Sequence, residues 1–146
     1  MLDLRNSREL VECHWNSLDH RAELPCAEKE YWDRSGPMGV QSDSQRRYHR
    51  YYLREIGIVH RDEHDLAVYA KDVSRMGVGF YSPIQLFPCD WVELQLPGKK
   101  TLTLQITRCL RIRARCFECG TVYGSNTEHP GRSRYESLTR GRETCR

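Results

Sequence analysis

Long apolar segments are absent from this sequence. No run approaches the roughly 18 consecutive apolar residues that a membrane-spanning helix requires. The first residues, MLDLRNSREL, lack the basic start and the apolar stretch of a secretory signal peptide. We therefore expect no membrane contact and a cytoplasmic location.

Apolar residues are also scarce for a chain of this length. Hydrophobic residues make up 38% of the 146 residues, and the mean hydropathy is −0.74. A chain of this size is expected to form one domain, and its low apolar content indicates that part of it lies outside the core. We expect an N-terminal helix and linker over residues 1–43, the domain itself over residues 44–124, and a basic tail over residues 125–146.

The chain lacks a strong net charge, although its basic residues are clustered. The formal net charge is only +3, so no strong overall field attracts a polyanion. Most basic residues are arginines, whose planar guanidinium binds a phosphate or a guanine edge through two hydrogen bonds. The three clusters are Arg46, Arg47, Arg50 and Arg54; Arg108, Arg111, Arg113 and Arg115; and Arg132, Arg134, Arg140, Arg142 and Arg146.

The seven cysteines do not form a metal-binding pattern. Without a secretory signal, they are expected to be reduced thiols or metal ligands instead of a disulfide framework. Cys116 and Cys119 form a Cys-x-x-Cys pair, whereas a structural zinc site requires four ligands and no second pair is spaced to complete one. We expect small buried strand residues here, with no bound metal and no cofactor.

Catalytic combinations of residues are missing as well. The sequence contains no nucleophile paired with a base and no Gly-rich loop of the kind that cradles phosphates. It therefore favours a binding module over an enzyme.

The N-terminal part has a helical period. Apolar residues recur at helical spacing and predict a helix over residues 1–24, ended by Pro25. Residues 26–45 combine turn formers with little periodicity, which predicts a linker. The apolar stripe consists of Leu4, Leu10, Val11, Trp15 and Leu18.

Beyond residue 50 the apolar period changes from helical spacing to two. Six short strands separated by turn signals predict a small all-β fold, an antiparallel barrel or sandwich. Pro97 and Gly98 suit the central positions of a type II turn. Leu66, Val68 and Ala70 share one strand face and Val73 lies on the other, so either a bulge lies near Lys71 or the buried face is not the one that these three residues share. The expected strands cover residues 51–59, 66–74, 76–82, 92–96, 102–112 and 116–124.

Two motifs stand one hairpin apart at the start of this region. The first is Arg-x-x-x-Arg at Arg46 and Arg50, and the second is Asp-x-Ser-x-x-Gly at Asp72, Ser74 and Gly77. In this order and on this strand pattern, residues 44–124 resemble the PilZ domain, a bacterial receptor module for cyclic di-GMP. The resemblance implies a six-stranded antiparallel barrel that binds this nucleotide and changes its shape or its protein partner in response.

The resemblance also implies roles for individual residues. The arginines would bind the phosphates or stack on the guanines, and Asp72 would accept hydrogen bonds from a guanine edge. Ser74 would add a second hydrogen bond, and Gly77 would leave room for a tight turn beneath the ligand. The expected ligand-binding residues are Arg46, Arg47, Arg50, Asp72, Ser74 and Gly77.

Three other interpretations remain open at this stage. Asp72 and Ser74 can each close a local turn through backbone hydrogen bonds, while the arginines form a solvated lead-in. A PilZ-like barrel can also act as a protein-interaction adaptor that binds no nucleotide.

The last interpretation is a small basic barrel that binds nucleic acid, although the sequence favours a plain solvent-facing strand. In this interpretation a basic, aromatic strand face is formed by Arg108, Arg111, Arg113, Arg115, Phe117 and Tyr123. The alternation also places the arginines of residues 111–115 on one face, with Leu110 and Ile112 opposite.

Overall fold

The computed structural model describes residues 4–38 and 49–124. Two helices come first, α1 (Leu4–Ser17) and α2 (Glu28–Asp33). The strands that follow are β1 (Tyr51–Tyr52), β2 (Ile56–Arg61), β3 (His64–Val73), β4 (Val78–Ser82), β5 (Trp91–Gln95), β6 (Leu102–Arg113) and β7 (Cys116–Tyr123).

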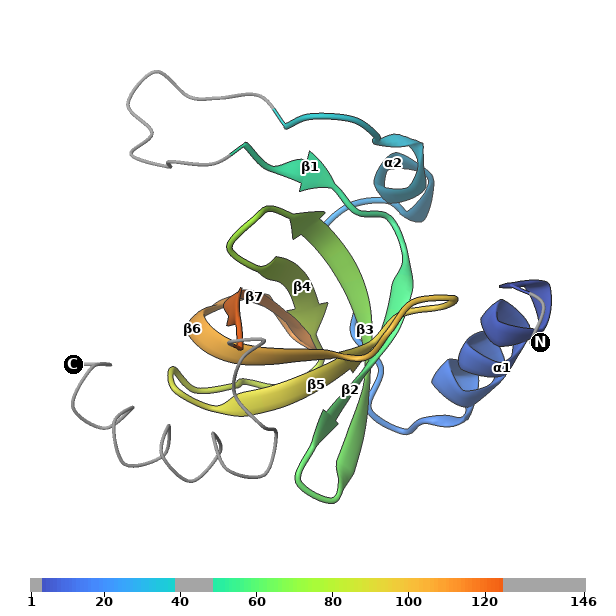
Figure 1. Ribbon diagram of the computed structural model, residues 1–146. Helices are drawn as coiled ribbons and strands as arrows, with labels where there is room; N and C mark the ends of the chain where they lie inside the picture. The colour runs from blue at the N-terminus through green and yellow to red at the C-terminus, as the bar shows by residue number, and fades with distance from the viewer. Residues whose placement is uncertain (1–3, 39–48, 125–146) are drawn as a thin grey trace.

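Within residues 49–124, six strands close into an antiparallel barrel (Figure 1). The sheet order is β1-β3-β2-β5-β6-β7-β4, and β3 also pairs with β4, which joins the two ends. β1 is an extra strand on β3, so the predicted first strand over residues 51–59 is divided into β1 and β2. The six-stranded antiparallel barrel predicted from the sequence is confirmed, with one strand added.

The barrel interior is filled by one apolar cluster. Leu66, Val68 and Ala70 of β3 all face it and are fully buried. The register between β3 and β4 shifts between Ala70 and Asp72, so Val73 packs against the same cluster despite its opposite parity. Of the two alternatives, the bulge is therefore confirmed. Its consequence is that Asp72 leaves the inner face of the strand.

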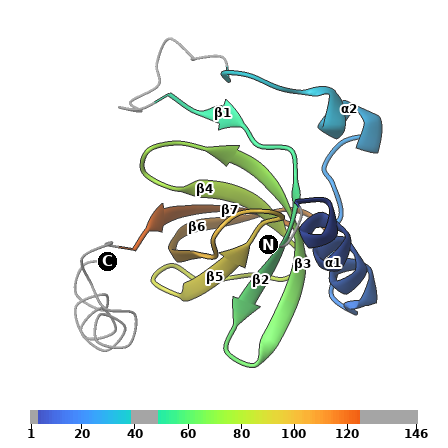
Figure 2. The ribbon, with the colours of Figure 1, turned by 45° about the vertical axis from the view of Figure 1, so that its right-hand side comes forward.

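Helix α1 covers β2 and β3 from outside the barrel (Figure 2). Val11 and Trp15 pack on Ile58 and Ala67, and the Trp15 indole N–H donates a hydrogen bond to the Val68 carbonyl at 3.0 Å. The helix ends at Ser17, earlier than predicted, because the following residues run alongside β3. Ala67 exchanges two backbone hydrogen bonds with that segment, one from its N–H and one to its carbonyl.

Part of the expected linker is a helix. Tyr31 of α2 is buried, and its hydroxyl donates a hydrogen bond to the Ala70 carbonyl at 2.5 Å and accepts one from the Glu55 N–H. Burial raises the pKa of Tyr31 well above its usual value, which keeps the hydroxyl protonated as a donor. The Arg54 guanidinium lies 4.4 Å from the centre of the Tyr31 ring. The last part of the predicted linker, residues 39–45, lies outside the described residues.

The turn between β5 and β6 agrees with the sequence. Gly98 has a φ of 69°, and the Lys99 N–H donates to the Leu96 carbonyl at 3.3 Å. A positive φ at the third residue is the requirement of a type II turn. Neither helix in the described ranges is long and apolar enough to cross a bilayer.

The arginines at the end of β6 and the apolar residues between them are all exposed. Leu110 and Ile112 are 50% and 46% exposed, like the arginines beside them. The reason is that β5 pairs with β6 only between Leu102 and Gln105, so the rest of β6 pairs with β7. A second register shift, between Arg111 and Arg113, also breaks the alternation.

Trp15→Ala should show how much the α1 contact stabilises the barrel. Removing this large side chain leaves a cavity and removes the hydrogen bond to the Val68 carbonyl, so we expect a loss of about 3–5 kcal/mol in the free energy of unfolding by urea. Leu10→Ala is the matched control on the same helix, because Leu10 is 62% exposed and should change stability by about 0.5 kcal/mol or less. Equal unfolding midpoints for both variants would contradict this docking.

Candidate functional site

Two bulges place a row of four residues on the outer face of the barrel. Across neighbouring strands, Asp72 pairs with Gly79, Gly79 with Gly120, and Gly120 with Arg108. Asp72 reaches this face through the bulge in β3, and Arg108 reaches it through a register shift after Ile106 in β6. A carboxylate and a guanidinium therefore lie at opposite ends of two residues that have no side chains.

The carboxylate of Asp72 is buried against Arg50. The Arg50 Nη1 donates a hydrogen bond to Asp72 Oδ1 at 3.1 Å, although 22 residues separate the two along the chain. The Asp72 side chain is only 1% exposed and that of Arg50 is 30% exposed. A buried carboxylate is stable only when it is paired, so Arg50 covers Asp72 and neutralises it.

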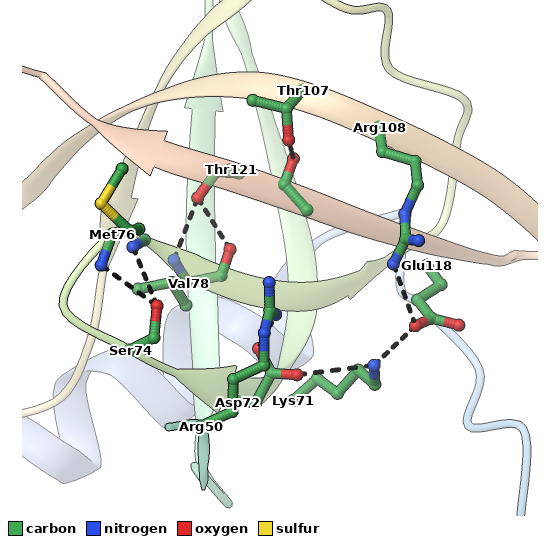
Figure 3. Close-up of polar contacts among 12 residues, drawn as sticks. Arg50, Lys71, Asp72, Ser74, Met76, Val78, Thr107, Arg108, Glu118 and Thr121 are labelled. Carbon is green, nitrogen blue, oxygen red and sulfur yellow. Dashed lines mark hydrogen bonds and ion pairs between the residues drawn. The ribbon is translucent and has the colours of Figure 1, made fainter. Parts of the chain in front are cut away.

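A chain of ion pairs continues from Asp72 across the outer face (Figure 3). Lys71 Nζ lies 3.5 Å from Asp72 Oδ2 and 2.5 Å from Glu118 Oε1. Arg108 Nη2 lies 3.9 Å from the same Glu118 oxygen, and its side chain is half exposed. Asp72 Oδ2 accepts no hydrogen bond from the described residues. Arg50 and Arg108 are therefore the cationic groups at the two ends of this chain of ion pairs.

Ser74 closes the turn between β3 and β4. Its hydroxyl oxygen accepts hydrogen bonds from the N–H groups of Met76 at 3.1 Å and Gly77 at 3.4 Å. The Ser74 N–H also donates to the Gly77 carbonyl at 2.9 Å. The local-turn interpretation therefore holds for Ser74, while Asp72 is held by Arg50 and Lys71 instead.

Gly77 is required because β7 passes close to the turn between β3 and β4. A Cβ atom added at Gly77 would lie 1.8 Å from the Thr121 carbonyl oxygen of β7. At Gly79 an added Cβ would lie 2.6 Å from Asp72 Oδ1. The first glycine allows β7 to approach the turn, and the second provides the space in which the Asp72 carboxylate lies.

The predicted site residues are only partly brought together. Arg50 and Asp72 touch, and Ser74 and Gly77 lie in the adjoining turn. Arg46 and Arg47 lie outside the described residues. Sequence reasoning did not find the outer row and its ion pairs, because a single-strand pattern does not identify cross-strand neighbours. The missed residues are Lys71, Gly79, Arg108, Glu118 and Gly120.

The segment that carries Arg50 is attached to the N-terminal extension. The Met38 N–H donates to the Arg50 carbonyl at 2.8 Å, and the Tyr52 N–H donates to the Gly36 carbonyl at 2.9 Å. Arg34 adds a hydrogen bond to the Tyr52 hydroxyl at 3.2 Å. Movement of Arg50 is therefore mechanically linked to residues 34–38.

The cysteines show one departure from expectation. Among the cysteines in residues 4–38 and 49–124, five are free thiols and Cys89 is disulfide-bonded, which corrects for Cys89 the expectation of a reduced thiol or a metal ligand. In the described part of the chain, no group of three or more His, Cys, Asp or Glu side chains is arranged to hold a metal ion. The free thiols are Cys13, Cys26, Cys109, Cys116 and Cys119.

Fold and site together define a small β-barrel module with a polar site on its outer face. The segment that carries Arg50, just before β1, lies against this site. The PilZ domain family model matches residues 44–139, well over half of the 146-residue chain. The chain therefore belongs to the PilZ domain family, which is known for binding cyclic di-GMP. A comparison with curated proteins finds no match.

Gly77→Ala tests whether this glycine is a structural requirement. The added methyl group collides with the backbone of β7, so the variant should lose about 1–3 kcal/mol or more of unfolding free energy. Gly120→Ala is the matched control on the same pair of strands, because its nearest contact would be an ordinary 3.6 Å from Thr107 Oγ1. It should change unfolding free energy by about 0.5 kcal/mol or less. If chemical denaturation finds the two variants equally stable, the close approach of β7 is not limiting.

Proposed function

We propose that this domain is a cyclic di-GMP receptor that changes its protein contacts when the nucleotide binds. The contact between Arg50 and Asp72 is the observation that carries the proposal, because it joins one residue from each of the two motifs. A non-enzymatic role and a cytoplasmic location, both expected from the sequence, are part of this proposal.

The chemistry of the outer face suits the nucleotide. Cyclic di-GMP has two phosphates that need cations and two guanines that need fixed polar groups. Asp72 accepts from the guanine N1 and N2 hydrogens, while Arg50 donates to a phosphate or to the guanine Hoogsteen edge. Ser74 keeps its hydroxyl hydrogen for donation, because its oxygen serves only as an acceptor in the turn. Arg108 is a further cation for a phosphate, across the two glycines.

Binding proceeds by exchange of partners. Asp72 is only 1% exposed and Arg50 lies over it, so a guanine reaches the carboxylate only when Arg50 moves away. The exchange leaves no charge unpaired, since guanine donors replace Arg50 on Asp72 and a phosphate replaces Asp72 on Arg50. Arg46 and Arg47, which precede Arg50 in the chain, supply additional cations.

In this proposal the segment that carries Arg50 transmits the effect of nucleotide binding to the N-terminal extension. Because the Arg50 carbonyl is bonded to Met38, a shift of Arg50 changes the position of residues 36–38. These residues follow α2, whose Tyr31 is bonded to the barrel at Ala70. The N-terminal extension is therefore the surface that an unidentified protein partner would bind.

A second candidate is an interaction adaptor that binds no nucleotide. It is favoured by the internal use of every described motif residue: Asp72 is paired, Ser74 closes a turn and Gly77 accommodates β7. A nucleic-acid surface on β6 has less support. Arg113 donates to the Leu24 carbonyl and so is not available along an open basic face.

Purified protein should bind cyclic di-GMP in preference to GTP, GMP and short oligonucleotides. Isothermal calorimetry is expected to give micromolar affinity, about −8 kcal/mol. No heat and no chemical-shift change at high ligand excess would favour the adaptor. Tight oligonucleotide binding that weakens steeply with salt would favour a nucleic-acid surface.

Arg50→Ala should weaken cyclic di-GMP binding by roughly 30-fold or more, since truncating a charged hydrogen-bonding partner costs about 2–5 kcal/mol. It should also lower unfolding free energy by about 1–3 kcal/mol, because a buried carboxylate loses its main partner. Binding is therefore measured well below the melting temperature of each variant.

Arg111→Ala is the charge-matched control, on the exposed end of β6. Its affinity and stability should both stay close to wild type. If Arg111→Ala abolishes binding and Arg50→Ala does not, the ligand face lies on β6 and the proposed site is wrong.

A further inference from the structure

Two cysteines face each other across β6 and β7. Cys109 and Cys119 are direct cross-strand partners, and their Sγ atoms are 3.4 Å apart. Directly opposed residues in antiparallel strands have Cα atoms about 4.5 or 5.5 Å apart. Both values fall within the range of about 4.4–6.8 Å that disulfides span. A disulfide bond therefore requires only that the two sulfurs approach to about 2.0 Å. The strands do not need to rearrange.

The two thiols have different surroundings. Cys119 is buried in the barrel core, whereas Cys109 lies at its margin and is partly exposed. The Cys109 sulfur accepts hydrogen bonds from the Cys119 thiol and from the Leu86 N–H, each at 3.4 Å. The Cys119 hydrogen bond is the main reason that the pKa of Cys109 is lowered to about 7.

The same hydrogen bond, followed by burial, raises the pKa of Cys119, so its proton is retained. Cys109 thus has the exposure and thiolate character of a group that attacks a disulfide. Cys119 is placed to attack the Cys109 sulfur in turn and displace the group that has become bonded to it.

Cys116 is not part of this pair. It lies three residues from Cys119 on one strand, and side chains at odd separation point to opposite faces. It packs outside the barrel in a cluster with Tyr31 and Tyr81. The Cys-x-x-Cys motif of the sequence therefore does not describe the neighbouring thiols, and Cys116 provides an internal control.

We propose that Cys109 and Cys119 form a reversible oxidation site, which closes to a cross-strand disulfide on reaction with a small-molecule disulfide such as oxidised glutathione. The Cys109 thiolate attacks one sulfur of oxidised glutathione, breaks its S–S bond and releases one glutathione thiolate. Cys119 gives up its proton to the released thiolate and attacks the Cys109 sulfur, which expels the second glutathione as a thiolate. That thiolate takes up from water the proton that Cys109 released when it ionised. The protein loses two hydrogen atoms, and oxidised glutathione is reduced to two molecules of glutathione.

The test is to map the bond in the full-length protein. The reduced chain is incubated with oxidised glutathione at neutral pH, quenched with acid, alkylated in denaturant and digested with trypsin. Arginines between the two cysteines separate them into different peptides, so a disulfide appears as a linked pair of peptides. Fragmentation then distinguishes Cys119 from Cys116 as the second sulfur. We expect a Cys109–Cys119 link that dithiothreitol removes.

Three variants establish the specificity of the link. Cys116→Ser should keep the linked peptides, while Cys109→Ser should lose them. Cys119→Ala is a second loss variant, which covers the case in which Cys109→Ser does not fold.

Exposed Cys13 reports that the oxidant is active. The proposal is overturned if Cys13 is glutathionylated while Cys109 and Cys119 are both alkylated. It is also overturned if Cys109 stops at a stable glutathione adduct, or if its sulfur is linked to Cys116.

Discussion

The pairing of β3 with β4 closes the barrel, and the geometry of the candidate site depends on it. At this seam one additional residue is accommodated between Ala70 and Asp72. Ala70 points into the core, and the bulge turns Asp72 to the outside, where Gly79 leaves room for its carboxylate. Without the bulge, the side-chain period of two would direct Asp72 into the apolar interior. A backbone irregularity is thus what makes a polar site possible on this strand.

The Arg50–Asp72 ion pair connects this seam to the N-terminal part of the chain. Desolvation makes an unpaired buried carboxylate costly, so the segment around Arg50 is held against the barrel. A nucleotide that supplies both donors and anions can replace each partner of the pair without leaving a charge buried alone. The same requirement for pairing that holds Arg50 on Asp72 therefore makes the proposed exchange selective for a ligand with both kinds of group.

Strands β6 and β7 have different chemistry on their two faces. Arg108 and Gly120 belong to the outer row, while Cys109 and Cys119, each one residue away, face the interior. Alternation along a strand separates the two pairs although they share a backbone. A covalent bond between the cysteines would tie together the same two strands that carry part of the proposed nucleotide site.

Much of the architecture was determined by the sequence alone. Alternation of apolar residues predicted six strands, Pro97 and Gly98 predicted their turn, and the parity change before Val73 indicated the bulge as one of two alternatives. These features are local, because each depends on residues within a few positions of one another. The association of Arg50 with Asp72 in one site was expected only through the resemblance to a family.

Contacts between distant segments were decided by the tertiary structure. An alternating pattern tells which residues share a face, but it does not tell which strand lies next to which, or where a neighbouring strand ends. The exposure of Leu110 and Ile112 follows from the early end of the β5–β6 pairing. The meeting of Cys109 with Cys119, in place of the adjacent Cys-x-x-Cys motif, follows from the register of β6 against β7. Strand order and register arise from packing the whole barrel, and for that reason they were not readable from any one segment.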